Sequence, residues 1–292
     1  MKGKIIILIL VLIVSNLSAQ ENEYPYPSLS PKGRISQIVG NTIIEIEYER
    51  PSVRKRQIFG ELVPWDKVWR TGAGSCTKIS FDKDVEVGGQ KIEAGKYSLF
   101  TIPNPEEWIV ILNKDTTLYG SYDYDHKNDI ARFVAIPIES NRFYETLNFD
   151  IEILPNNAKI YISWENVQVS FDIETTTDFE IKKLIEDELL TEKNKDSDIY
   201  AGAAEYLFFQ GENLMDAITL TNIAIELNEN NGWARSLKIK IYEKMKLFSM
   251  ALAEIENYTK YAQSRKWEDE IEKKSTFEFL EKEHLRISNL KE

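Results

Sequence analysis

The chain has 292 residues and a formal net charge of −12, and 42% of its residues are hydrophobic. This hydrophobic content predicts packed cores and excludes a chain that is disordered throughout. Both halves of the chain are acidic, which argues against a nucleic-acid-binding protein, because affinity for phosphate backbones needs clustered lysine and arginine side chains. The single cysteine, Cys76, allows no intramolecular disulfide.

Residues 1–19 have the three parts of a secretory signal peptide. Lys2 and Lys4 precede an apolar run at 5–14, and Ala19 ends a small, polar stretch. A helix of ten residues covers about 15 Å, whereas the hydrocarbon core of a bilayer is roughly 30 Å thick, so we expect cleavage rather than a membrane anchor. No cysteine stands at the cleavage edge to carry a lipid. The sequence therefore predicts an exported protein, periplasmic or extracellular, with no membrane span after cleavage.

Residues 20–33 form a proline-punctuated leader, and residues 34–177 have the pattern of a β-rich domain. Residues 42–48 alternate apolar and acidic side chains, as a half-buried strand does. Gly88-Gly89 predicts a tight hairpin turn, because glycine reaches positive φ without a steric cost. We expect further strands at 78–81, 84–87, 90–92, 96–102, 108–112, 132–138, 145–153, 159–164 and 167–173. Many short strands with frequent turns predict a β-sandwich or an open barrel.

Residues 178–292 have helical spacing, which makes the chain a multidomain β plus α protein. Ala217 and Ala251 are 34 positions apart, and Phe208 and Tyr242 share this offset. A 34-residue period with small residues in the second helix is typical of tetratricopeptide-like antiparallel helix pairs; an unrelated bundle of paired helices is the alternative. A stack of this kind presents a concave face, where we expect a protein or peptide partner.

Two segments carry the candidate binding residues of the β domain. In residues 48–77 the guanidinium groups suit a carboxylate or phosphate, and the tryptophans suit a small anionic or sugar-like ligand. In residues 113–132 polar side chains gather in a tyrosine- and aspartate-rich loop. The candidates are Arg50, Arg56, Trp69, Arg70, Thr71, Asn113, Asp129 and Arg132. The alternative is structural, with arginines that pin a long loop through backbone carbonyls and through Glu47, Glu49 and Glu61.

Metal and catalytic motifs are not found in the sequence. Asp123, Asp125 and Asp129 miss the spacing of a calcium-binding EF-hand loop, because Lys127 occupies a ligand position. His126 is the only histidine of the β domain, and a single histidine does not build a zinc site. The motifs of serine hydrolases, phosphate-binding loops, dinucleotide-binding folds and zinc proteases are missing. We therefore expect no metal and no cofactor, and no catalytic residue is assigned.

The motifs of residues 48–77 resemble the bacterial domain-of-unknown-function family numbered 2911. The resemblance is carried by Arg50-Pro51-Ser52-Val53, Ile58-Phe59-Gly60, Leu62-Val63-Pro64, Trp69-Arg70-Thr71-Gly72-Ala73, Ala94-Gly95-Lys96-Tyr97-Ser98-Leu99 and Asn113-Lys114. It implies secretion, a β-rich fold and a bacterial envelope setting, and it implies no activity. This chain departs from the family pattern at Gly74-Ser75-Cys76, where an asparagine, an acidic residue and an alanine are usual, and at Tyr119, where a tryptophan is usual.

Three hypotheses about function follow. The first is a non-enzymatic envelope protein, in which the β domain binds or scaffolds and the helical tail meets a partner. The second is a hydrolase or sugar-acting enzyme with its site in the β domain. The third is a purely structural β domain that carries a partner-binding tail. The arginines distinguish them, because guanidinium groups that converge on an open pocket favour a ligand site.

Overall fold

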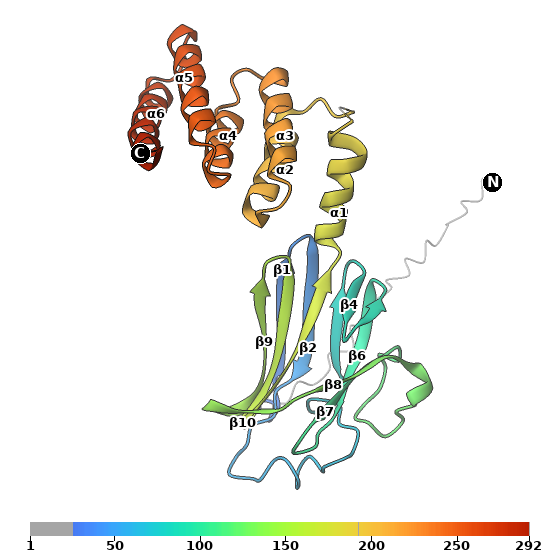
Figure 1. Ribbon diagram of the computed structural model, residues 1–292. Helices are drawn as coiled ribbons and strands as arrows, with labels where there is room; N and C mark the ends of the chain where they lie inside the picture. The colour runs from blue at the N-terminus through green and yellow to red at the C-terminus, as the bar shows by residue number, and fades with distance from the viewer. Residues whose placement is uncertain (1–25, 192, 292) are drawn as a thin grey trace, which may run out of the picture.

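The computed structural model describes residues 26–191 and 193–291, so the expected signal peptide and residues 20–25 of the leader lie outside the described residues. Two antiparallel sheets are followed by a run of helices (Figure 1). In this described part of the chain the sheets form an open sandwich and do not close into a barrel. The predicted combination of a β-sandwich with C-terminal helices is confirmed.

The larger sheet has six strands in the order β1-β2-β3-β6-β7-β8. Its strands are β1 (Lys32–Val39), β2 (Thr42–Glu49), β3 (Thr77–Phe81), β6 (Gly95–Ile102), β7 (Trp108–Asn113) and β8 (Asp129–Ala135). In β2 the side chains of Ile44, Ile46 and Tyr48 are buried, while Glu45 and Glu47 between them are half-buried. The alternation seen in the sequence is thus the inward and outward pleat of this strand.

The smaller sheet has four strands in the order β5-β4-β10-β9. Its strands are β4 (Val85–Val87), β5 (Gln90–Ile92), β9 (Ile138–Leu154) and β10 (Asn157–Thr175). The sequence predicted two strands where β10 is one, because irregularities in its pairing around Glu165 bend the strand without ending it. The predicted strand at 132–138 was also wrong in its extent: Pro137, which has no amide hydrogen to donate, separates β8 from β9.

Large side chains from both sheets fill the space between them. Trp69 stacks on Trp164 at 5.8 Å between ring centroids, and Phe59 meets the edge of Trp108 at 5.2 Å. Trp69 and Phe59 come from the segment of residues 50–76 that joins β2 to β3. This long connection is therefore anchored by aromatic side chains in the core and covers one end of the sandwich (Figure 1).

The helices begin directly after β10. They are α1 (Thr177–Leu184), a π-helical turn (Ile185–Leu189), α2 (Ser197–Gln210), α3 (Leu214–Leu227), α4 (Gly232–Lys244), α5 (Phe248–Ser264) and α6 (Glu270–Lys291). From α2 onward each helix packs against the next. Helices α3 and α5 begin 34 residues apart, and Ala217 and Ala251 occupy the same buried position in them. A tetratricopeptide-like repeat remains a prediction. Among the described residues no helix has the length and apolar character to cross a bilayer.

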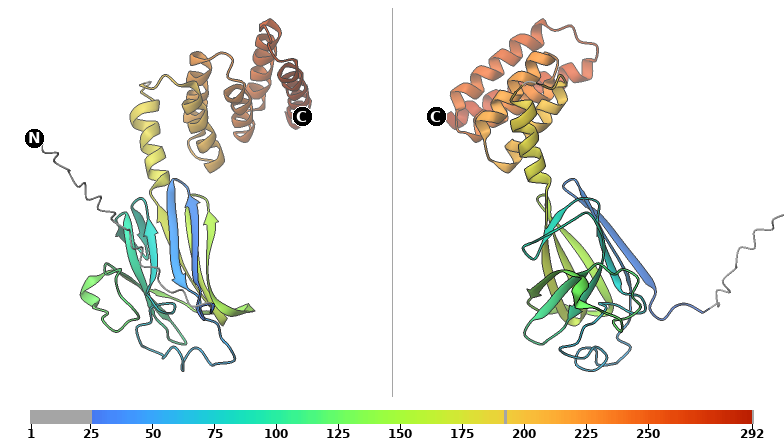
Figure 2. Two further views of the ribbon diagram at one scale, coloured as in Figure 1. Left: turned by 180° about the vertical axis from the view of Figure 1, so that it is seen from behind. Right: turned by 90° about the vertical axis from the view of Figure 1, so that its right-hand side faces the viewer.

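The junction between the two parts is a small set of polar contacts. Asn41, in the turn between β1 and β2, donates its backbone N–H to Thr177 Oγ1 at 2.9 Å. The Asp178 carboxylate accepts hydrogen bonds from Asn156, in the turn between β9 and β10, and from Tyr206 of α2. The helices therefore stand at the end of the sandwich opposite to residues 50–76 (Figure 2).

Candidate functional site

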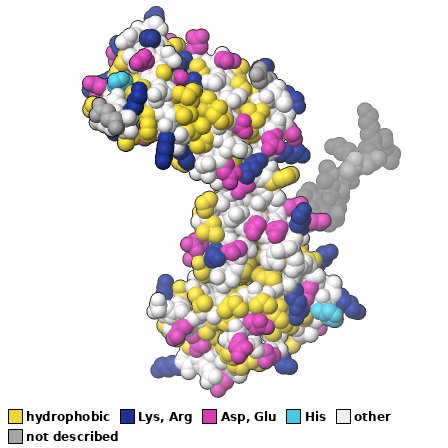
Figure 3. Space-filling model, in the orientation of Figure 1, with side chains coloured by type: hydrophobic (Ala, Val, Ile, Leu, Met, Phe, Trp, Pro, Cys, Tyr) yellow, Lys and Arg dark blue, Asp and Glu magenta, His cyan; other side chains and the backbone are white. Residues whose placement is uncertain are grey.

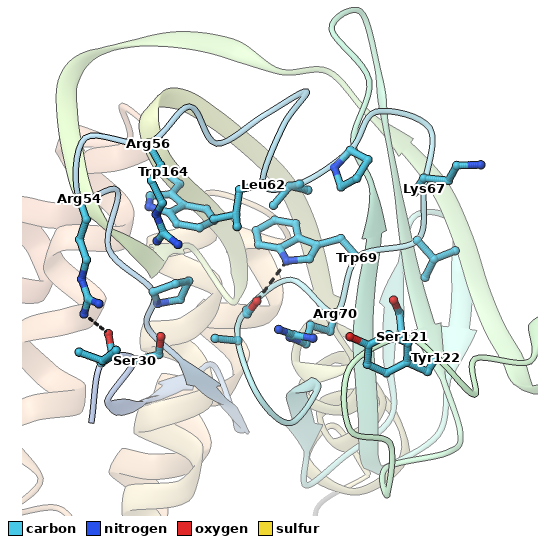
Figure 4. Close-up of a pocket in the computed structure, with 17 residues that line it drawn as sticks. Ser30, Arg54, Arg56, Leu62, Lys67, Trp69, Arg70, Ser121, Tyr122 and Trp164 are labelled. Carbon is cyan, nitrogen blue, oxygen red and sulfur yellow. Dashed lines mark hydrogen bonds between the residues drawn. The ribbon is translucent and has the colours of Figure 1, made fainter. Parts of the chain in front are cut away.

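A cavity of about 610 Å³ lies beside the segment of residues 50–76 (Figure 4). Most of its lining comes from that segment, and the rest comes from Leu29 and Ser30, from Ser121 and Tyr122, and from Trp164 of β10. We call it the Arg70 cavity. Its volume lies within the range of about 300–1,000 Å³ that small-molecule sites occupy.

The lining of the Arg70 cavity is positively charged. Arg54, Arg56, Lys67 and Arg70 contribute to it, and no aspartate or glutamate does. The chain as a whole carries a formal charge of −12, so this excess of cations is local. A concave site lined by one sign of charge concentrates ligands of the opposite sign, so the cavity attracts anions.

Arg54 and Arg56 are held by backbone carbonyls. Arg54 Nη2 donates to Leu29 O at 2.5 Å, while Arg56 donates through Nε to Val53 O at 3.1 Å and through Nη2 to Ser52 O at 2.6 Å. A carbonyl orients a guanidinium group without cancelling its charge, because it carries no net charge of its own. The two arginines thus fix their surrounding loop and still contribute positive charge to the cavity.

The side chain of Arg70 differs from those of Arg54 and Arg56, because it has no hydrogen bond or ion pair with any described residue; its backbone carbonyl accepts from the Thr77 N–H at 3.2 Å. Its Nε is buried without a hydrogen-bond partner. The guanidinium group lies against Gly120, where a Cβ atom would approach Arg70 Nη1 to 3.1 Å, and Gly120 has a φ of +71°. Glycine at this position therefore provides both the left-handed turn and the space for the guanidinium group.

The two tryptophans of the cavity lining, Trp69 and Trp164, are both buried. Trp69 is 9% exposed and donates Nε1–H to Gly72 O at 3.1 Å, and its ring lies nearly parallel to that of Trp164. Trp164 is 2% exposed, and its Nε1 is buried without a hydrogen-bond partner. Because both rings are buried, they do not form the exposed aromatic platform on which a sugar ring stacks.

Three of the predicted site residues form a separate network on β7 and β8. Asn113 is fully buried and donates Nδ2–H to Asp129 Oδ1 at 2.9 Å. Asp129 Oδ2 accepts from Tyr124 Oη at 2.6 Å and from Arg132 Nη1 at 3.2 Å. Burial and the Asp129 carboxylate raise the pKa of Tyr124 well above its ordinary value, so the hydroxyl remains a donor. This network does not line the Arg70 cavity. It holds both ends of the segment of residues 114–128, and that segment brings Ser121 and Tyr122 to the cavity.

The segment of residues 114–128 is also joined to the connection that carries Arg70. Gly120 donates its N–H to Gly74 O at 2.9 Å, and Ser75 pairs with Tyr119 in an isolated antiparallel bridge. Positions 75 and 119 are two of those at which the sequence departs from the resembled family pattern. The structure thus places these two departures in direct contact.

Two further predicted residues serve the fold outside the cavity. Arg50 donates to Leu147 O and to Asn148 Oδ1, both at 3.2 Å, and so ties the β2–β3 connection to β9. Thr71 is fully buried with a φ of +52°, and its hydroxyl lies 3.0 Å from Thr101 Oγ1. It follows Arg70 directly and fixes the backbone there.

Of the predicted residues, the structure brings Arg56, Trp69 and Arg70 together at the cavity. Arg50, Thr71, Asn113, Asp129 and Arg132 lie outside its lining. The structural alternative, in which arginines pin the loop, holds for the contacts with backbone carbonyls. The predicted acidic partners do not pair with these arginines: Glu47 pairs with Lys96, and Glu49 accepts from the backbone N–H of Ser75. Sequence reasoning did not find Lys67, Ser121, Tyr122 and Trp164 as lining residues. Among the described residues no three His, Cys, Asp or Glu side chains are grouped as metal ligands.

Comparison with known proteins gives one match. A family described as "Protein of unknown function (DUF2911)" matches residues 30–173. The match covers both sheets and ends before α1 begins. No curated protein and no solved structure matches the chain.

Proposed function

The β-rich part of this chain, residues 30–173, belongs to the DUF2911 family of proteins of unknown function, and on that premise we propose that it is a binding domain for a small organic anion. The observation that carries the proposal is the lining of the Arg70 cavity, which has four cationic side chains and no carboxylate. Arg70 adds specificity, because its guanidinium group has no partner within the described protein and is available to a ligand. Arg70 is half-buried, and a bound anion supplies the counter-charge that no described residue gives it.

The same lining favours binding over catalysis. It contains no histidine, cysteine, aspartate or glutamate that could take up a proton near neutral pH. The hydroxyl groups of Ser30, Ser121 and Tyr122 have no such base beside them in the cavity, so none has the partner that activates a nucleophile. These features support a non-enzymatic role over a hydrolase or sugar-acting enzyme.

The proposal extends to the whole chain as an exported envelope protein with two binding parts. The signal-like pattern of residues 1–19 supports export to the periplasm or beyond. The helical part supports a protein or peptide partner, because hydrophobic side chains gather on its face in Figure 3 and Phe209, Trp233 and Met250 are exposed. Apolar side chains that gather into an exposed patch mark interaction surfaces. Nucleic acid is disfavoured by the acidic charge.

The proposal is tested by titration calorimetry with 3-phenylpropanoate, its neutral amide and inorganic phosphate. We expect 3-phenylpropanoate to bind and the amide to bind about tenfold or more weakly, because the charge-assisted hydrogen bonds to Arg70 are lost. Arg70→Gln is expected to abolish that preference for the acid. Arg142→Gln removes an exposed arginine outside the cavity and serves as the control. Equal binding of acid and amide, or an unchanged preference in Arg70→Gln, contradicts the proposal.

A further inference from the structure

The arginines of the Arg70 cavity form two separate groups. Figure 4 shows Arg54 and Arg56 on one side of the cavity, while Arg70 lies on the side of Ser121. The side chain of Lys67 extends away from both groups in the same view. The hydrogen bonds agree with this division, because Arg54 and Arg56 are held by backbone carbonyls to which Arg70 makes no hydrogen bond. The cavity therefore presents positive charge at two places rather than at one.

The group of Arg54 and Arg56 keeps donors for a ligand. Their carbonyl contacts occupy Nη2 of Arg54 and both Nε and Nη2 of Arg56, so Nη1 of each has no partner among the described residues. Arg54 and Lys55 have positive φ values of +49° and +59°, which residues other than glycine rarely adopt. Lys55 lies outside the lining, so this turn brings the two arginines to the cavity and leaves out the lysine between them.

Arg70 offers the second group of donors through its Nη atoms. Its Nε is buried and is therefore closed to an occupant of the cavity. Nη1 and Nη2 also have no hydrogen-bond partner among the described residues, but they are not buried. Two neighbouring N–H groups of one guanidinium pair with the two oxygens of a carboxylate, so this end of the side chain suits one carboxylate.

The remaining surface of the cavity is uncharged. Apart from the four cations, its lining consists of glycine, residues with hydroxyl groups and apolar residues such as Pro51, Leu62, Val63 and Val68. A ligand that reaches both groups of arginines must lie along this surface. Polar groups on such a ligand would lose hydration there, whereas an apolar chain would not, so the surface favours an apolar spacer.

We infer that the Arg70 cavity binds a dicarboxylic acid with an apolar spacer, one carboxylate at Arg70 and the other at Arg54 and Arg56. A monocarboxylate would leave one of the two groups without a counter-charge. A phosphate monoester carries two charges but concentrates them on one group of atoms, so it also meets only one of them. This inference rests on the proposed function and specifies its ligand.

Three matched probes at each chain length test the two contacts. They are the linear dicarboxylates from butanedioate to decanedioate, their monoamides and their diamides, compared by titration calorimetry on the full chain at constant ionic strength. At the length that spans both groups, we expect the dicarboxylate to bind about tenfold or more tightly than its monoamide, because it makes a second set of charge-assisted hydrogen bonds. The monoamide should in turn bind about tenfold more tightly than the diamide, as the proposed function requires.

Variants assign the two carboxylates to residues. Arg70→Gln should remove most of the advantage of the dicarboxylate over its monoamide, and so should Arg54→Gln combined with Arg56→Gln. Lys55→Gln is the control, because it removes a positive charge from the same turn at an exposed position outside the lining, and it should keep the advantage. Arg54→Lys combined with Arg56→Lys retains both charges and should keep most of it. Equal losses in the lysine and glutamine pairs would assign the effect to the shape of the loop and contradict the inference.

The outcomes distinguish this inference from the proposed function. If no dicarboxylate binds more tightly than its monoamide, or if phenyl phosphate binds more tightly than every dicarboxylate, the second carboxylate is overturned and an anion site remains. If the diamides bind as tightly as the monoamides and the dicarboxylates, the anion site itself is overturned.

Discussion

The two parts of this molecule differ in the largest and the smallest side chains of their cores. The sandwich contains Trp69, Trp108 and Trp164 together with many β-branched residues. The helical part instead buries a series of alanines: Ala201, Ala203, Ala204, Ala217, Ala224, Ala234, Ala251 and Ala262. The reason is spacing, because two facing sheets lie about 10 Å apart and need large side chains between them, whereas paired helices approach as closely as their contact residues allow. We therefore expect the stability of the sandwich to be most sensitive to a loss of side-chain volume, and the stability of the helical part to be most sensitive to added volume.

The largest effect is expected from a large-to-small change in the sandwich. Trp108→Ala should lower the free energy of unfolding of the β part by about 3–5 kcal/mol, because it leaves a cavity beside the rings of Phe59 and Trp69. Hydrogen exchange resolved by mass spectrometry should show faster exchange in the strands and little change in α2 to α6. Trp233→Ala, at a half-exposed position in α4, should have a smaller effect. Equal losses in both variants would contradict the contrast.

A small-to-large change should have the next largest effect, and in the helices. Ala217 is fully buried in α3, so Ala217→Leu should destabilise the helical part by about 1–3 kcal/mol through overpacking against neighbouring helices. Urea unfolding followed by helical circular dichroism measures this loss. Ala253→Leu, at an exposed position in α5, is the control and should change little. A stable Ala217→Leu variant would show that the helices are not closely packed at this position.

The smallest expected effect is a loss of stability of the helical part at acidic pH. Arg286 binds the Glu243 carboxylate and holds the pKa of that group below its ordinary value of 4.5. A lowered pKa contributes stability that is present above the unfolded pKa and is lost as pH falls through the folded pKa. The helical part should therefore lose up to about 1 kcal/mol of unfolding free energy below about pH 4.5.

Arg286→Gln tests this assignment, because it should reduce the acid-dependent loss in the helices. The sandwich has a comparable pair, in which Lys96 lowers the pKa of Glu47, and its acid response should be unchanged by this substitution. Urea midpoints measured for each part at neutral and acidic pH separate the two contributions. An unchanged helical response in the variant would assign the acid loss to other groups.

The sequence was informative wherever a local pattern decided the structure. Alternation predicted β2, and Gly88-Gly89 predicted the hairpin between β4 and β5. The lengths of β9 and β10 were not predictable, because long-range pairing carries β10 through its irregularity at Glu165. The local sequence of β10 does not show which strand pairs with it.

The candidate site was predictable in one segment only. Arg56, Trp69 and Arg70 lie in a single motif-rich stretch, so they were found together. Ser121 and Trp164 reach the same cavity from distant segments, which only tertiary pairing brings near. The grouping of Asn113 with Asp129 and Arg132 was correct in space, yet these side chains satisfy one another's hydrogen bonds and support the cavity from outside it.

The Asp178 carboxylate has a mechanical consequence. It receives Asn156 from the tip of the β9–β10 hairpin at 2.6 Å and also the hydroxyl of Tyr206 in α2. Burial and Asp178 raise the pKa of Tyr206 to about 12, so this hydroxyl stays protonated over the physiological range. Rotation of the helices about the end of β10 would break the contact from Asn156 and also the hydrogen bond from Asn41 to Thr177. The cavity beside Arg70 and the exposed face of the helices therefore lie at opposite ends of the molecule, so that both can be occupied at the same time.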